Sequence, residues 1–218
     1  KHEAATDDLK AGLGITRETG DRGNEAIVLY ALAALARNRG QGDEAQAGYR
    51  EALSIHRQLG DRRLEGATLG DLAGLLWRQG GLEEARSYYQ QALVLHRDVG
   101  NRRAEGIHLA DLAELERARG ELGAARSHYE TALAIHRDVA DRVSEGSVLT
   151  NLGLLHHQEG RLGQARVLSD DLTIAAIRNA HLARGENGHY LVKAGKEIAR
   201  LLKDDYDRLH SILERIHV

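Results

Sequence analysis

Four residue types are missing from this sequence: proline, cysteine, methionine and phenylalanine. Without cysteine, the chain has no disulfide framework, no thiolate metal ligand and no cysteine nucleophile. Average usage would give about eleven prolines in a chain of this length, so their absence favours a helical protein. No apolar stretch is long enough for a signal peptide or a membrane span. These absences predict a helix-rich, cytoplasmic protein.

An excess of positive charge is also missing. The 30 lysines and arginines are balanced by 33 aspartates and glutamates, which gives a formal charge of −3. This balance, with no basic tract, argues against nucleic acid or an anionic membrane as the main partner. At 218 residues, the chain is long enough for one substantial core or two small ones.

What the sequence does contain is a repeat with a period of forty residues. The four blocks open at Gly20-Asp21-Arg22, Gly60-Asp61-Arg62, Gly100-Asn101-Arg102 and Ala140-Asp141-Arg142. The repeat divides the chain into 1–19, the second half of a truncated repeat; 20–59, 60–99 and 100–139, three complete repeats; 140–180, a fourth repeat with a degenerate second helix; and 181–218, C-terminal capping or oligomerisation helices.

Each block is predicted to form two helices. In the second block, leucines recur at helical spacing from about Arg62 to Arg78, and Asp61 is well placed as the N-cap. Gly80 ends this helix, because glycine adopts the left-handed conformation without steric cost. The second helix is expected from about Leu82 to Val99, with Ala85, Tyr89, Ala92 and Leu93 buried. His96-Arg97 near its end is interpreted as basic residues that complement the helix dipole.

This pattern resembles the tetratricopeptide repeat (TPR). The second block has the family's sequence of large, small and aromatic residues: Leu69, Leu72-Ala73, Leu76, Gly80, Ala85, Tyr89 and Ala92-Leu93. The fourth block departs from the motif at Ser169, where an aromatic belongs. A period of forty is similar to the longer-helix variant found in Pins-type adaptors and bacterial regulators. The resemblance implies an all-α, TPR-like α-solenoid, a right-handed superhelix of antiparallel helix pairs with a C-terminal helical cap.

The resemblance also implies a concave groove lined by the first helix of each pair. Six candidate peptide-binding residues are expected there: Asp71, Trp77, Asp111, Glu114, Arg117 and Asn151. Related repeats often have asparagine at the position of Asp71, where its amide clamps a peptide backbone, and two aspartates favour a basic or amide-rich ligand. The alternatives are an ordinary solvated helix face for the polar positions and packing against the neighbouring helix for Trp77.

The C-terminal segment carries a separate apolar stripe at heptad-like spacing. Its members are Leu202, Tyr206, Leu209, Leu213 and Ile216. Such a stripe is typical of a helix that caps the last repeat, or of one that mediates oligomerisation or partner binding. The sequence leaves both alternatives open.

No motif in the sequence points to catalysis, a cofactor or a metal. The sequence has no glycine-rich phosphate loop, no nucleophile elbow and no His-Glu-x-x-His pattern. The recurring histidines at 56, 96 and 136 are separated by a full repeat, which is too far for a shared zinc ion. We therefore predict that the chain is not an enzyme and needs no metal or other cofactor.

Three hypotheses of function follow from the sequence. The first is a non-catalytic scaffold that binds a protein or peptide in the groove. The second is an engineered or chimeric building block that self-associates through its C-terminal helices and has no natural ligand. The third is a regulatory fragment of a larger bacterial ATPase or transcription factor. The start at Lys1, within a repeat, favours a processed, trimmed or constructed chain.

Overall fold

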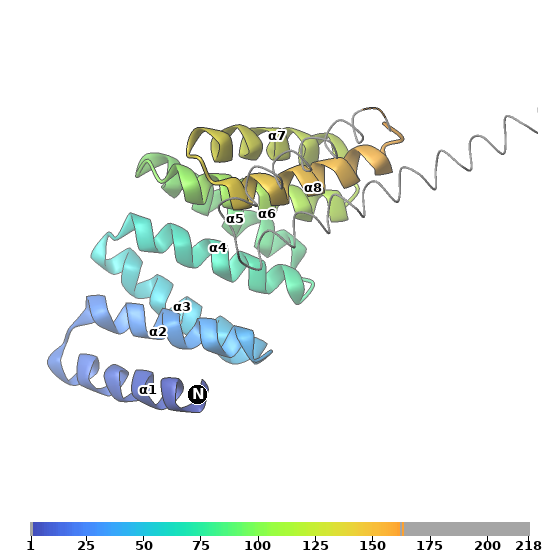
Figure 1. The fold of residues 1–218 in the computed structure, drawn as a ribbon. Helices are drawn as coiled ribbons and strands as arrows, with labels where there is room; N and C mark the ends of the chain where they lie inside the picture. The colour runs from blue at the N-terminus through green and yellow to red at the C-terminus, as the bar shows by residue number, and fades with distance from the viewer. Residues whose placement is uncertain (1, 162, 164–218) are drawn as a thin grey trace, which may run out of the picture. The chain divides into compact units, whose positions relative to one another are not determined.

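The computed structural model describes residues 2–161 and 163, and side chains from residue 5 onward. This part of the chain contains helices and no strand (Figure 1). The helices are α1 (His2–Thr19), α2 (Arg22–Asn38), α3 (Gly42–Leu59), α4 (Arg62–Arg78), α5 (Leu82–Asp98), α6 (Arg102–Ala118), α7 (Leu122–Asp138) and α8 (Arg142–Gln158). The predicted all-α class is therefore confirmed.

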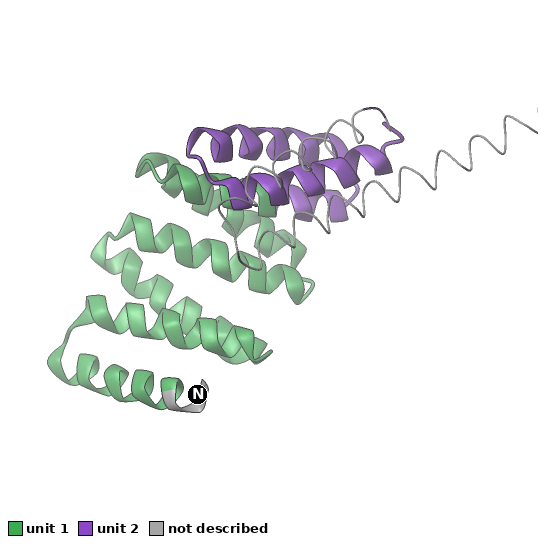
Figure 2. Cartoon of the chain, viewed as in Figure 1, with its two compact units in different colours: residues 1–111 green, residues 112–218 purple. Residues whose placement is uncertain are grey.

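The chain divides into two compact units, residues 1–111 and residues 112–218 (Figure 2). In unit 1, α1 packs on α2, α2 on α3, α3 on α4 and α4 on α5. In unit 2, α7 packs on α8. Helices that follow one another along the chain therefore pack together, as in an α-solenoid built from helix pairs.

The helices begin and end where the sequence predicts. The Asp61 side chain accepts a hydrogen bond from the backbone N–H of Leu64 at 3.0 Å, which caps α4 at its N-terminus. The predicted first helix of this block, Arg62–Arg78, is confirmed in full, and the second helix ends at Asp98, one residue before the predicted end. Gly80 has a φ of 87°, a left-handed conformation that side chains disfavour.

Ala140 departs from this glycine pattern. It has a φ of 54° at the turn after α7, where the equivalent residue of the preceding block, Gly100, has a φ of 66°. The Cβ of an L-residue crowds the following carbonyl oxygen in this conformation. Residue 140 therefore carries backbone strain that a glycine would relieve.

We expect the substitution Ala140→Gly to stabilise the chain by about 1 kcal/mol, because relief of the left-handed strain exceeds the added flexibility of the unfolded chain. The reverse change at the equivalent turn, Gly100→Ala, should destabilise it by a similar amount, about 1 kcal/mol. Urea unfolding of both variants and the parent measures this, and equal midpoints for all three would contradict the expectation.

Tyrosine and alanine fill the core of each helix pair. Tyr49, Tyr89 and Tyr129 occupy equivalent positions and are all buried, as are the predicted core residues Ala85 and Ala92. Alanine at these positions lets the helices approach closely, and tyrosine takes the slot for which phenylalanine is absent. One consequence is that three tyrosine hydroxyls lie inside the fold, where each requires a hydrogen-bond partner.

An arginine–glutamate ion pair recurs where each second helix meets the next first helix. Within unit 1, Arg57 Nε lies 2.9 Å from Glu65 Oε1, and Arg97 Nε lies 2.8 Å from Glu105 Oε1. Glu105 is only 3% exposed, whereas Arg97 is half-exposed. The guanidinium of Arg97 therefore compensates the negative charge of a carboxylate that the fold buries. Arg97 thus has a defined partner as well as a favourable position at the end of a helix.

Candidate functional site

We call one side of unit 1 the first-helix face. It consists of residues three or four positions apart on the first helices of successive pairs, so they share a side of each helix. Its members are Tyr30, Ala34 and Arg37 on α2, Asp71, Gly74, Trp77 and Arg78 on α4, and His108 and Asp111 on α6. Three of the six candidate binding residues, Asp71, Trp77 and Asp111, lie here.

Asp71 is bonded to two side chains from the preceding repeat. The Tyr30 hydroxyl donates a hydrogen bond to Asp71 Oδ2, and Arg37 Nη1 lies 2.6 Å from Asp71 Oδ1. Burial and the nearby carboxylate raise the pKa of Tyr30 well above its usual value, so its hydroxyl remains a donor. Asp71 is thus a neutralised junction between α2 and α4, and it no longer favours a basic ligand by itself.

Tyr49 lies directly behind this junction. Its ring contacts that of Tyr30 edge to face, with the ring centroids 5.5 Å apart. Its hydroxyl is buried and has no hydrogen-bond partner. Burial, together with the negative charge of Asp71, raises the pKa of Tyr49 to about 12. The Tyr30 ring therefore packs against a tyrosine whose buried hydroxyl has no hydrogen-bond partner.

Asp111 has a different environment from Asp71. Its carboxylate is 43% exposed and lies 3.3 Å from Nδ1 of His108 on the same helix. The His108 ring stacks on that of His96 from α5, with centroids 5.1 Å apart and an angle of 26° between the rings. A row of three polar side chains therefore runs from the exposed Asp111 to the interior of unit 1.

His96 is the innermost residue of this row. It is fully buried, and neither ring nitrogen has a hydrogen-bond partner. Burial is the main cause that lowers the pKa of His96, to about 4, and repulsion from His108 lowers it further, whereas Glu105 acts in the opposite direction. His96 is therefore neutral at pH 7, and of the pair His96-Arg97 only the arginine brings a charge to this helix end.

Two glycines of α4 make room for the stacked histidines. A Cβ at Gly70 would lie 2.2 Å from the His108 ring, and a Cβ at Gly66 would lie 2.9 Å from the His96 ring. Both values are shorter than carbon contacts in folded proteins. The position of His108 is taken by Val28, Thr68 and Val148 in the other blocks, so this pair is an exception within the repeat.

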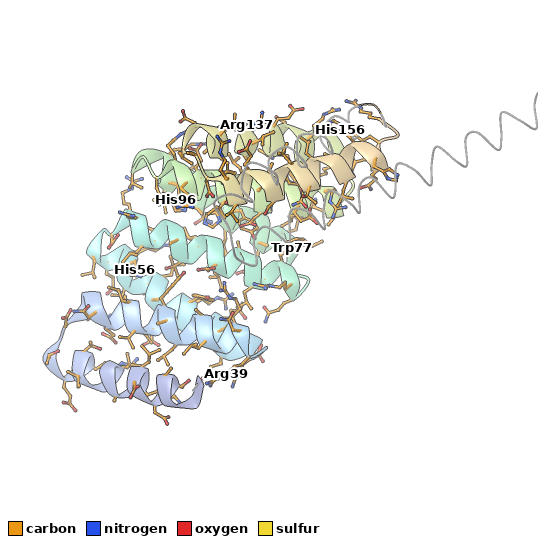
Figure 3. All side chains as sticks on the ribbon, viewed as in Figure 1. Arg39, His56, Trp77, His96, Arg137 and His156 are labelled. Atoms are coloured by element: carbon orange, nitrogen blue, oxygen red, sulfur yellow. The ribbon has the colours of Figure 1, made fainter. Side chains whose placement is uncertain are left out.

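Trp77 lies near the C-terminal end of α4 (Figure 3) and is half-buried, and the next residue in the sequence is Arg78. Arg78 is exposed, and its Nε donates a hydrogen bond to the carbonyl oxygen of Gly74 at 3.2 Å. Tryptophan and arginine are both enriched among the residues that contribute most to binding energy at interfaces.

Unit 2 contains the other three candidates. The carboxylate of Glu114 accepts a hydrogen bond from the hydroxyl of Tyr129 at 2.5 Å and is bound by two nitrogens of Arg117, with Nε 3.0 Å from Oε2. Burial alone would raise the pKa of Glu114, but the hydrogen bonds from Arg117 and Tyr129 lower it below its usual value. Asn151 is half-buried on α8.

The partners of the predicted residues escaped the sequence analysis. Tyr30 and Arg37 bind Asp71, and Tyr129 binds Glu114, but the contacts join residues up to 41 positions apart. The available signal was the repeat itself, because Tyr30 stands where the other blocks have the smaller residues Gly70, Ala110 and Thr150.

Several predictions concern residues outside the described part of the chain. Leu202, Tyr206, Leu209, Leu213 and Ile216, predicted to form a cap or interface, all lie there. Among residues 2–161 and 163, no three histidine or carboxylate side chains come together as a metal site would require. None of the described helices combines the length and apolar character needed to cross a membrane.

These observations define an all-α helical-repeat protein with polar side chains clustered on its first helices. The tetratricopeptide repeat family matches residues 2–98 and 105–169. The chain belongs to the tetratricopeptide repeat family, as its sequence resemblance predicted. No curated protein matches it significantly.

Solved structures share the fold at low sequence identity. BtubC (BKLC) from P. vanneervenii is 20% identical with a TM-score of 0.73, and the match covers 98% of this chain and 92% of that one. A putative kinesin light chain of Podosopora anserina with nearly identical TPR-like repeats is 18% identical with a TM-score of 0.64, covering 84% and 90%. A Rap protein complexed with Competence and Sporulation Factor is 18% identical with a TM-score of 0.70, covering 99% and 65%.

Proposed function

We propose that this chain is a non-catalytic scaffold that binds a protein or peptide on the first-helix face. The observation that carries the proposal is the Tyr30–Arg37–Asp71 cluster, on the same face of α4 that carries Trp77. Its side chains are fixed by mutual hydrogen bonds, yet Arg37 and Asp71 are about a quarter exposed. Groups held in one conformation at an accessible surface bind a partner with little loss of side-chain entropy.

The fold relatives support this assignment. The Rap protein has a structure complexed with Competence and Sporulation Factor, so one relative of this fold is known with a bound factor. Helical repeats present an extended surface made of residues from many helices, which suits an elongated ligand. On this face the proposed contacts are Asp71, Trp77 and Asp111. The three candidates of unit 2, Glu114, Arg117 and Asn151, remain proposed contacts of that unit by itself.

The sharpest single test is Trp77→Ala. In a screen with a phage-displayed library of random short peptides, we expect peptides that bind the parent chain to bind this variant at least about tenfold more weakly, because half-buried tryptophans contribute strongly to interfaces. Affinities from fluorescence anisotropy measure the effect, and circular dichroism verifies that the variant is folded.

A matched control is Val94→Ala, which truncates a side chain that is 54% exposed on the second helix α5. This variant should bind the same peptides within about twofold of the parent, since Val94 is not part of the first-helix face. If no peptide binds the parent, or if Trp77→Ala and Asp111→Asn leave every selected peptide bound as tightly as before, the assignment is wrong. Asp71→Ala is a poorer probe, because it breaks a junction between α2 and α4.

A further inference from the structure

The third block contains a carboxylate site that the chain fills with its own side chain. Glu114 receives a hydrogen bond from the buried Tyr129 hydroxyl and a two-pronged contact from Arg117. Together a tyrosine O–H and a guanidinium satisfy both carboxylate oxygens. The chain itself thus demonstrates which ligand chemistry this arrangement accepts.

Forty residues earlier, the tyrosine recurs, but the carboxylate is absent and Trp77 takes the position of Arg117. The residue equivalent to Glu114 is Gly74, and the residue equivalent to Tyr129 is Tyr89. A Cβ at Gly74 would lie 3.2 Å from the Tyr89 hydroxyl, so that hydroxyl lies directly against the glycine. Tyr89 is 2% exposed, and none of the hydrogen bonds in the described part of the chain involves its hydroxyl. The Tyr89 hydroxyl does not belong to the fully buried, unpartnered polar atoms of the described residues, so it keeps some contact with the surface, where a ligand can reach it.

The positively charged side chain of Arg78 is bonded to the backbone of the same glycine, Gly74. Arg78 donates from Nε to the Gly74 carbonyl oxygen, which holds its guanidinium beside residue 74. None of the ion pairs in the described residues occupies Arg78. Arg78 can therefore supply the charge that Arg117 supplies to Glu114, with its remaining N–H groups available.

The neighbouring carboxylates do not exclude an acidic ligand, because each has a positive or polar partner. Arg37 and Tyr30 bind Asp71, and His108 lies against Asp111. Burial raises the pKa of Tyr89 far above its usual value, so its hydroxyl stays protonated and can donate a hydrogen bond to an incoming anion. The first block differs here, because the hydroxyl of its tyrosine, Tyr49, is fully buried and the Tyr30 ring packs against the Tyr49 ring.

We propose that Gly74, Arg78 and Tyr89 form a subsite for the carboxylate side chain of a bound peptide. The absent side chain of Gly74 leaves space for a ligand group in the place that Glu114 occupies one block later. The Tyr89 hydroxyl donates a hydrogen bond to one carboxylate oxygen, and Arg78 pairs with the other. This inference rests on the proposed function, and it reverses the expectation from Asp71 and Asp111 of a basic ligand.

The first experiment tests the chemistry of the subsite without any peptide. Gly74→Glu adds a carboxylate tethered as Glu114 is, and Gly74→Gln adds its neutral counterpart. In the parent background, we expect Gly74→Glu to unfold at a higher urea concentration than Gly74→Gln. When both variants also carry Tyr89→Phe, this difference between them should disappear. Equal midpoints for the two substitutions in the parent background would overturn the carboxylate assignment.

The second experiment uses peptides from the random library, synthesised with acetylated N-termini and amidated C-termini. Replacing the glutamate or aspartate of a binding peptide by glutamine or asparagine should weaken its binding to the parent about tenfold, as expected for loss of hydrogen bonds to a charged group. The same replacement should have no effect on binding to Arg78→Gln or Tyr89→Phe. A free C-terminal acid that restores binding to the neutral peptide would show that the chain terminus, not a side chain, is bound.

Two variants on the same helices serve as matched controls. Arg63→Gln removes another exposed arginine of α4, and Tyr88→Phe removes the neighbouring hydroxyl of α5, which interacts with Glu84 instead. Both should retain the preference for the acidic peptide. If peptides bind but Tyr89→Phe and Arg78→Gln keep the full preference, the subsite is wrong and the proposed function stands. If no peptide binds, the proposed function fails, and the stability comparison alone decides the subsite.

Discussion

Acidification from pH 6.5 to pH 4 is expected to remove about 3 kcal/mol of folding free energy through His96 alone. The folded chain holds this ring neutral, since its pKa there is about 4 against 6.5 in the unfolded chain. Between these values the unfolded chain binds the proton and the folded chain does not. The contribution of neutral His96 to the free energy of unfolding is therefore fully present above pH 6.5. It decreases as the pH falls toward 4, and below that value His96 causes no further loss.

The causes of this sensitivity lie in the packing around the ring. His96 has no hydrogen-bond partner for either nitrogen, so a proton would place an unsolvated charge inside unit 1. His108 stacks on it and would add repulsion when protonated, whereas Glu105 from the next first helix favours the charged form. The half-exposed Asp111 carboxylate lies 3.3 Å from Nδ1 of His108.

Urea unfolding at a series of pH values measures this prediction. Between pH 6.5 and the pH at which carboxyl groups titrate, about 4, the free energy of unfolding of the His96→Leu variant should depend much less on pH than that of the parent. The control is His56→Leu at the equivalent position of the preceding block, where burial also lowers the histidine pKa but Thr68 replaces the stacked histidine. A parent chain whose stability stays constant over this interval would refute the assignment of a buried neutral His96.

Gly70→Ala is expected to destabilise the chain by about 2 kcal/mol, although alanine is the better helix former by about 1 kcal/mol. The added Cβ would lie 2.2 Å from two atoms of the His108 ring, so the ring must move and its stacking on His96 must be lost. The energetic cost of the steric overlap with His108 should exceed the gain in helix propensity. The sign of the measured change in the free energy of unfolding shows which effect is larger.

A second substitution tests the cause. Adding His108→Val removes the overlapping ring. The double variant then has alanine and valine at these two positions, as the chain has forty residues later at Ala110 and Val148. We expect the double variant to recover most of the lost stability in thermal or urea unfolding. Two destabilisations that simply add would show that Gly70 and His108 do not interact, since independent sites are additive.

Much of the fold could be predicted because one pattern is repeated. Asp61, Gly80 and the apolar positions of the second block set the helix bounds locally, through capping, a left-handed turn and helical spacing. Each block repeats the same capping residue, turn residue and apolar spacing, so helix bounds that are ambiguous in one block can be read from the others. The family resemblance then supplied the packing of one pair on the next.

The site could be predicted only in part, because its chemistry depends on departures from the repeat. Asp71 was found from its column on the first helices, but its neutralisation by Arg37 depends on side-chain lengths across two packed helices. His96 was expected to assist the helix dipole, whereas its environment makes it neutral. Gly70 and His108 gave a signal in retrospect, because both differ from their equivalents in the other blocks.

The recurring arginine–glutamate pairs bear on how the number of blocks can change in evolution. If a recombination event deleted residues 60–99, Arg57 would precede Glu105 by the same eight positions that now separate it from Glu65, and the junction would be restored intact. The same deletion would align His108 with Tyr30 in place of Gly70, where no space is left for its ring. The ion pairs thus make blocks interchangeable, while the glycine–histidine pair fixes the order of two of them.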